Sequence, residues 1–284
     1  MTMSPRLAPV DLDALLEHVT DGALMAIPSG FNAEFSGVSM VATRALIRKG
    51  LKDLNLLAVP ATGMQADMLI GAGCVASIQT GSILLYEYGR ASRFIEAQQQ
   101  GTIKVKDSTC PAIHAALLAG EKGLPFMPVR GLIGSDVLRH RAHDDGWHLM
   151  DNPFGDNDPI VVVPPLRPDV ALFHVPLADR FGNVWIGRRS ELSTMARAAK
   201  KTLVTFEEFF DGDLLDSNDK APATIPEMYL TALSHQPKGS WPFHCGDLYP
   251  EDSRHLREYA DLSRTEDGFA NYLNRYVLDE PEHA

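Results

Sequence analysis

The chain is short of cysteine, of positive charge and of long hydrophobic runs. Its three cysteines, Cys74, Cys110 and Cys245, lie far apart among 284 residues and form no CxxC pair. This pattern excludes a disulfide scaffold and disfavours a structural zinc site, so we expect no metal. No run of about 18 apolar residues occurs, so the sequence predicts no transmembrane helix. We therefore expect a cytoplasmic protein with no membrane partner.

Positive charge is scarce as well. The formal net charge is -11, whereas a nucleic-acid partner needs a basic face that can neutralise phosphates. We therefore predict no nucleic-acid partner. Short basic clusters could still meet the phosphates of a nucleotide-bearing substrate, although solvated charge is their commoner role. These clusters are Arg139-His140-Arg141, Arg188-Arg189 and Lys200-Lys201.

Apolar runs alternate with segments of helical periodicity. A strand at residues 23–27, a helix at 38–49 ended by Gly50, and a strand at 54–59 form a βαβ unit. The fold class is therefore α/β, with an open, doubly wound and mainly parallel sheet. The other expected helices are 11–19, 66–70, 93–100 and 112–118, and the other expected strands are 75–79, 102–105, 124–127, 160–163, 170–175 and 203–206.

Polar stretches divide the chain. Residues 139–158, rich in Asp, His, Asn and Gly, predict a long exposed connection within an α/β domain at 1–210. Residues 211–284 predict a connecting segment followed by a helical tail that packs on the same domain. In that tail, Phe269, Tyr272 and Tyr276 recur at helical spacing.

Several segments together resemble the A-type chain of class I coenzyme A transferases, in particular the glutaconate type. That family begins with Asp-Gly, two residues, three apolar residues and Gly-Gly-Phe. Here Asp21-Gly22 opens the pattern and Pro28-Ser29-Gly30-Phe31 stands in place of the glycine pair and aromatic. The resemblance extends over roughly residues 15–278. Further similar segments are 45–54, 69–73, 123–130, 134–136, 167–175, 178–183, 249–252, 255–259 and 269–277.

The resemblance implies a CoA-transferase fold and an activity that needs a second chain. A glutamate of a separate B (beta) subunit would attack an acyl-CoA, and CoA would pass through a glutamyl-CoA thioester to a carboxylic acid. This chain would line the site as the alpha subunit, and the complex would be a hetero-oligomer or self-associating. No cofactor is required beyond coenzyme A as part of the substrate. Within this chain, Glu87 in Tyr86-Glu87-Tyr88-Gly89 is the weaker alternative nucleophile.

The turn Ser29-Gly30-Phe31-Asn32 is the main candidate for substrate binding. It follows a predicted buried strand and precedes a helix, where backbone N–H groups can stabilise an oxyanion. A purely geometric role for the glycine is the other interpretation. If the turn lies at the active site, a bulky change such as Gly30→Val should lower turnover and leave folding largely intact.

Two further candidates for substrate binding are Cys110 and Trp241. Cys110 precedes a helix whose N-terminus could lower the pKa of the thiol, although a buried structural role is commoner. Trp241 replaces a histidine of the similar family segment, which indicates a more apolar acyl pocket unless it only packs. We expect His114 and His174 to be packed or hydrogen-bonded rather than catalytic.

Two other functions remain open at this stage. The ring-opening acyl-CoA hydrolases of steroid breakdown resemble the same family and use a glutamate of the A-type chain. Asp107 is the only carboxylate in the corresponding segment 104–110, which weakens this alternative. The second alternative is a non-catalytic acyl-CoA binding protein that has kept the fold.

Overall fold

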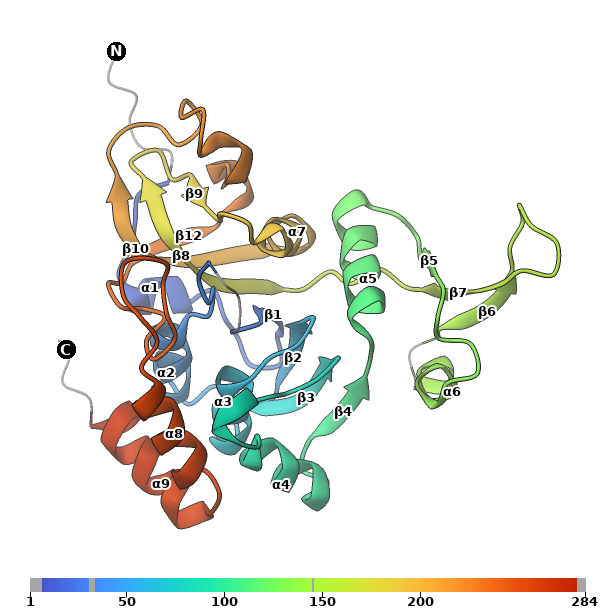
Figure 1. Cartoon of the computed structure of the whole chain (residues 1–284), viewed down its shortest axis with the longest axis horizontal. Helices are drawn as coiled ribbons and strands as arrows, with labels where there is room; N and C mark the ends of the chain where they lie inside the picture. Colours follow the sequence, from blue (N-terminus) through green and yellow to red (C-terminus); the bar gives the residue numbers. More distant parts are fainter. Residues whose placement is uncertain (1–6, 31–33, 145, 280–284) are drawn as a thin grey trace.

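A mainly parallel sheet forms the centre of the molecule (Figure 1). The computed structural model describes residues 7–30, 34–144 and 146–279. The parallel strands follow the order β4-β3-β2-β1-β8-β10-β12. This confirms the predicted α/β fold with its parallel sheet. The strands are β1 (Leu24–Pro28), β2 (Leu54–Val59), β3 (Val75–Thr80), β4 (Lys104–Asp107), β8 (Val170–Asp179), β10 (Lys201–Phe210) and β12 (Ala232–His235).

Two hydrophobic cores cover opposite faces of this sheet. Side chains alternate between them along β1: Met25 and Ile27 join one core, and Ala26 joins the other. The first core includes α1 (Leu12–Leu16), α2 (Met40–Arg48), α3 (Met64–Gly71) and α4 (Ser92–Gln100). The second includes α5 (Cys110–Lys122) and α7 (Ser190–Ala198). The sheet is therefore doubly wound, as predicted.

A small antiparallel sheet projects from the outer side of α5 (Figure 1). It has the order β5-β7-β6, and α6 lies beside it. The predicted long exposed connection at 139–158 is wrong, and so is the placement of residues 160–163 in the parallel sheet. All four residues of β6 are exposed and show no alternation, whereas Trp147 and Val161 are buried against α5. The elements are β5 (Met127–Val129), α6 (Asp136–Asp144), β6 (His148–Asp151) and β7 (Pro159–Val163).

The C-terminal third continues the main sheet before it becomes helical. β12 pairs with β10, so the sheet extends past residue 210. Tyr259 and Tyr272 of the C-terminal helices pack with Met64 and Met68 of α3, which seats the tail on the same domain. No helix in the described ranges has the length and hydropathy to cross a bilayer. The remaining elements are β9 (Val184–Trp185), β11 (Thr224–Ile225), α8 (Ser253–Leu262), α9 (Glu266–Leu273) and the short helical turns η1 (Tyr86–Tyr88), η2 (Ala221–Ala223), η3 (Glu227–Tyr229) and η4 (Asn274–Leu278).

Candidate active site

A cleft of about 510 Å³ opens at the carboxyl ends of β1 and β2. This edge of an open α/β sheet is where such folds bind ligands. Ser29, from the predicted substrate-binding turn, lies in its wall, whereas Phe31 and Asn32 lie outside the described residues. The cleft is lined by Ser29, Val59, Pro60, Ala61, Tyr86, His114, Arg189, Ser190, Glu191 and Thr194.

Arg189 holds the segment that follows β1, of which the structure describes residues 29–30 and 34–37; we call these residues the site turn. Its Nη2 donates to Ser29 O at 3.0 Å, and its Nη1 donates to Phe35 O at 2.9 Å and to Ser36 O. Its Nε donates to Glu191 Oε1 at 2.5 Å. One guanidinium therefore fixes three carbonyl groups of the turn and pairs with a carboxylate of the cleft wall.

The burial of Arg189 was not foreseen. The sequence placed it in a basic cluster with a solvated role, but only 1% of its surface is exposed. Gly37 makes room for it: φ is +74° there, and a Cβ would lie 2.8 Å from Nη1 of Arg189. In the sequence, the only sign that Arg189 is buried was its place in an arginine pair ahead of a helix. Gly37, which leaves space for the guanidinium, is distant in the sequence and lies beside Arg189 only in the folded chain.

Gly30 is buried under a second segment, the closing loop (residues 236–250). A Cβ at Gly30 would lie 3.2 Å from the ring of Phe243 in that loop. The glycine therefore allows the closing loop to approach the site turn. The expectation that Gly30→Val would leave folding largely intact is not supported, because the larger side chain must displace a buried aromatic ring.

Cys110 does not line the cleft, and it is exposed rather than buried. It is the first residue of α5, whose N-cap Thr109 accepts from Ala112 N at 3.4 Å. His114, one helical turn further, lines the cleft, although the sequence predicted it to be packed or hydrogen-bonded. The start of α5 therefore forms part of the cleft rim.

The structure does not bring Trp241, Glu87 or Asp107 to the cleft wall. The Trp241 ring packs on His255 of α8, with 4.2 Å between centroids, and the Arg44 guanidinium lies 4.9 Å from its centroid. Glu87 is exposed on η1, next to the cleft-lining Tyr86. Asp107 is exposed at the end of β4. Trp241 therefore has a packing role between the closing loop and the C-terminal helices.

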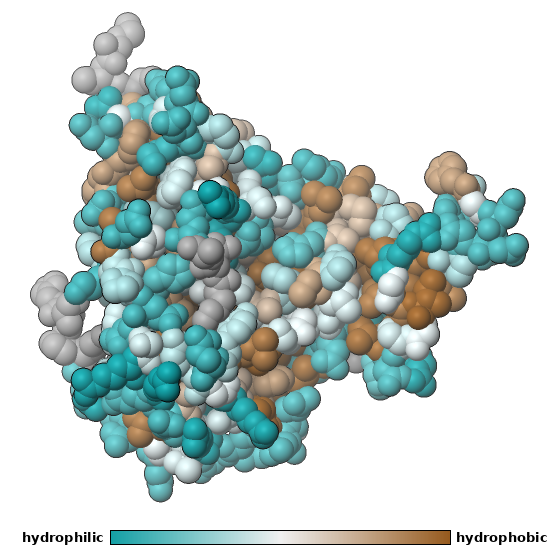
Figure 2. All heavy atoms as spheres, in the orientation of Figure 1, coloured by the Kyte–Doolittle hydropathy of each residue, from teal (hydrophilic) through white to brown (hydrophobic). Residues whose placement is uncertain are grey.

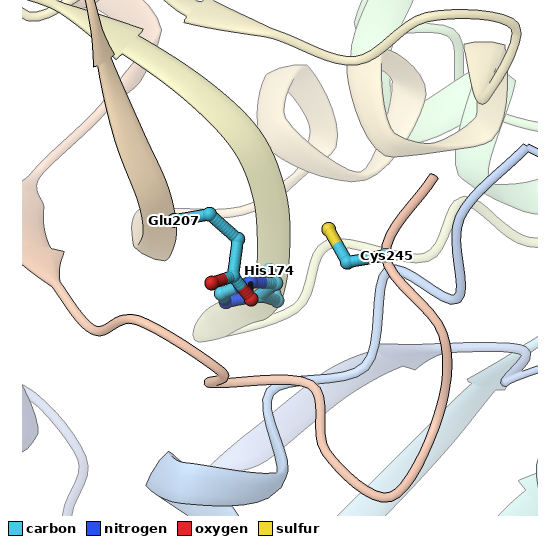
Figure 3. A group of neighbouring side chains, drawn as sticks. All are labelled: His174, Glu207 and Cys245. Carbon is cyan, nitrogen blue, oxygen red and sulfur yellow. Dashed lines mark hydrogen bonds and ion pairs between the residues drawn. The ribbon is translucent and has the colours of Figure 1, made fainter. Parts of the chain in front are cut away.

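Next to the site turn, His174, Glu207 and Cys245 form a buried group (Figure 3). Among the described residues, these three could offer ligand atoms to one metal ion, since the atoms lie within 4.8 Å of one another. However, His174 Nε2 and Glu207 Oε1 are 2.7 Å apart, and Nδ1 is 2.8 Å from Thr205 Oγ1. Two ligands of one tetrahedral zinc lie about 3.3 Å apart. The geometry is that of a hydrogen-bonded network, not of a metal centre.

The ionisation of this group agrees with its hydrogen bonds. Burial opposes ionisation of Glu207, but hydrogen bonds from His174 and Tyr249 outweigh it and hold the pKa of the carboxyl below its ordinary value. Burial, together with the Glu207 carboxylate, raises the pKa of the Cys245 thiol. The network therefore holds a carboxylate beside a neutral sulfur.

Comparison with known proteins identifies the family. A family model described as Coenzyme A transferase matches residues 11–235. The A-type chain of glutaconate CoA-transferase from Acidaminococcus fermentans is 30% identical over 286 residues, which cover 95% of this chain and 88% of that protein. The crystal structure of glutaconate coenzyme A-transferase from the same organism has a TM-score of 0.84 at 28% identity, covering 96% of this chain and 90% of that chain.

Other relatives extend this picture. An uncharacterized protein of Archaeoglobus fulgidus is 31% identical over 93% of this chain, which spans only 58% of that longer protein. Among more distant relatives, the A-type chain of 3-oxoadipate CoA-transferase from Pseudomonas knackmussii is 28% identical, and the cholesterol ring-cleaving hydrolase IpdA subunit of Rhodococcus jostii is 25% identical. The family match over most of the chain and the glutaconate-type relative confirm the resemblance seen in the sequence, and the chain belongs to the coenzyme A transferase family.

Proposed function

We propose that this chain is the alpha (A-type) subunit of a CoA-transferase and acts with a B subunit that supplies the nucleophilic glutamate. The complex moves CoA from an acyl-CoA to a carboxylic acid, with coenzyme A as part of the substrate and no other cofactor. One observation carries this proposal. Of the described residues that line the cleft, Glu191 is the only acid, and it is paired with Arg189 at 2.5 Å. A carboxylate held in this way is a poor nucleophile, so the attacking group comes from the partner.

The contribution of this chain is the placement of backbone donors. In a trans peptide the C=O and N–H groups point in opposite directions. Because Arg189 draws the carbonyl of Ser29 towards itself, the N–H of Gly30 points away from Arg189. We assign the stabilisation of the oxyanion that forms when the thioester is attacked to backbone N–H groups of the site turn, whose Ser29 lines the cleft. Arg189 therefore acts through the turn rather than on the substrate.

Exposed apolar side chains support a role within an oligomer. They gather on the projecting small sheet, which shows as a brown area in Figure 2. Phe154 is 95% exposed and Leu149 is 54% exposed. Apolar surface of this kind often marks an interface. We expect sedimentation to show self-association of the isolated chain or a stable mixed oligomer with the B chain, and a monomer that ignores the B chain would contradict this.

Neither alternative from the sequence has comparable support. A hydrolase of the ring-opening type would need a carboxylate of this chain at the site, but Asp107 is exposed and does not line the cleft. The more similar relatives with a stated activity are chains of transferases. A non-catalytic binder would give no covalent intermediate, so the test below separates it from a transferase.

The test is to trap the intermediate in the complex. The chain is co-expressed with the B-type chain from a neighbouring gene and incubated with acyl-CoA in the absence of an acceptor acid. We expect intact-mass measurement to find CoA attached to the B chain alone. The isolated chain should transfer no CoA. An adduct on this chain, with its loss in Glu87→Ala, would assign the nucleophile to Glu87; the absence of any adduct and of transfer to any acid would refute the proposal.

A further inference from the structure

The closing loop (residues 236–250) forms the outer support of the site turn. Ser36 N donates to His244 O at 3.2 Å, and Ser36 Oγ lies 2.8 Å from Ser240 Oγ. Gly30 lies against the ring of Phe243. The site turn is thus held between Arg189 on one side and the closing loop on the other. The position of the closing loop therefore affects the position of the site turn.

A single carboxylate, that of Glu207 in β10, holds the loop near both of its ends. Lys238 N donates to Oε2 at 2.6 Å, and Tyr249 OH donates to Oε1. Ser240 N also donates to Tyr249 OH at 3.2 Å. Glu207 is only 4% exposed. Charge-assisted hydrogen bonds shielded from water are strong, and their loss would leave a buried charge without its partners.

His174 in β8 fixes the direction of this carboxylate. Its Nε2 lies 2.7 Å from Glu207 Oε1, and its Nδ1 lies 2.8 Å from Thr205 Oγ1. Figure 3 shows the His174 and Glu207 side chains meeting. Gly239 allows the loop to pass the ring, because a Cβ there would lie 2.7 Å from His174 Cε1. These contacts hold the Glu207 carboxylate in the orientation in which it accepts from Lys238 N and Tyr249 OH.

We propose that Glu207 is a positioning residue for the transfer reaction: its carboxylate clamps the closing loop, and the loop sets the place of the site turn. This inference rests on the proposed function. The side chain does not line the cleft, so it acts through the loop and not on the substrate. Its loss should reduce turnover more than substrate affinity, because misplacing a donor weakens transition-state binding above all.

The three cysteines offer a test of the clamp that does not depend on activity. Cys245 is buried in the closing loop, Cys74 is buried elsewhere and Cys110 is exposed. Alkylation with iodoacetamide followed by peptide mass measurement reports on all three in one sample. In Tyr249→Phe, which keeps the Glu207 carboxylate, we expect Cys245 to react at least about tenfold faster and Cys74 to keep its wild-type rate. Glu207→Gln should also speed the labelling of Cys245, but it removes the carboxylate that raises the pKa of this thiol, so the rate in Tyr249→Phe decides. The exposed Cys110 should react at the same rate in every variant, which shows that the reagent is equally active in each sample.

Activity of the assembled complex is measured with the same variants. In Glu207→Gln we expect kcat to fall about 10²-fold and KM for acyl-CoA to change less than about threefold. The matched control is Tyr276→Phe, which removes a phenol bonded to Glu258 in the C-terminal helices. It should change neither the Cys245 rate nor kcat.

Several outcomes would overturn the inference. Unchanged labelling of Cys245, wild-type kcat despite faster labelling, or equal effects in Tyr276→Phe would each do so. If Glu207→Gln does not assemble, Tyr249→Phe decides. A wild-type complex that transfers no CoA refutes the proposed function, while the labelling rates still decide whether Glu207 clamps the loop.

Discussion

Replacing Arg189 by lysine should show whether Arg189 acts through the hydrogen bonds that position the site turn or only through its positive charge. Lysine keeps the positive charge but has a single ammonium group, which cannot reach three carbonyl oxygens and Glu191 together. We expect at least two charge-assisted hydrogen bonds to be lost. At about 1.5–3 kcal/mol each, this is about 3–6 kcal/mol, divided between folding stability and the geometry of the turn. A displacement of the turn by about 1 Å would lower kcat about 10²-fold.

The neighbouring residue provides a matched control. Arg188 is exposed, and its backbone N–H donates to Glu34 Oε2 of the site turn, a bond that Arg188→Lys keeps, so this variant makes the same change of side chain one position earlier. Both variants are assembled with the B chain, and urea unfolding and kcat are measured in parallel. We expect Arg189→Lys to be impaired in both measurements and Arg188→Lys in neither. Wild-type kcat in a folded Arg189→Lys complex would refute the role given to this guanidinium.

Individual contacts support three further predictions. Burial raises the pKa of Asp67 to about 6 from 3.8, against hydrogen bonds from Phe94 N and Tyr259. The folded state therefore binds the proton more tightly, and the added stability, about 1 kcal/mol at pH 5 relative to pH 8, is lost as the pH rises through 6. Asp67→Asn should remove this part of the pH dependence of urea unfolding, and an unchanged profile would contradict the prediction. Gly30→Ala should destabilise the chain by about 1–3 kcal/mol because its Cβ meets Phe243. Adding Phe243→Leu should restore part of the lost free energy of unfolding. A Gly30→Ala variant as stable as the wild type would show that the Phe243 ring has room for the added methyl group. Maleimide labelling of Cys110 should slow CoA transfer, and acyl-CoA should slow the labelling; labelling without effect on transfer would place Cys110 outside the substrate path.

Local patterns predicted much of the main sheet. The strand at 54–59 was predicted with its observed bounds because all but one of its residues are apolar and buried on both faces of a parallel sheet. The helix ends at Gly50 and Gly101 were predicted correctly because a glycine commonly ends a helix by adopting positive φ, and both glycines do so here. In the small sheet, the strand at 160–163 was predicted and matches β7, but β6 was missed because it is exposed on both faces and lacks any periodicity. Pattern alone cannot find a strand whose only reason to exist is its pairing with β7.

The site was only partly predictable. Ser29 was found from a family motif, but Arg189 and Glu207 owe their roles to partners distant in the sequence. Arg189 meets Ser29 across 160 positions, and Glu207 meets His174 across a strand pair whose register the sequence does not reveal. From the sequence alone, a buried charged side chain cannot be told from an exposed one, because its burial depends on partners that are found only in the folded chain. The B-chain partner and the cytoplasmic location stay predictions.

The position of α5 (Cys110–Lys122) links the two sheets mechanically. Ile113 and Leu117 belong to the core under the parallel sheet, whereas Ala112 and Ala116 belong to the core of the small sheet. The same helix begins with Cys110 and carries His114 into the cleft. Packed cores shift as units rather than deform freely. A partner that binds and displaces the small sheet would therefore also displace α5, and with it His114 in the cleft wall.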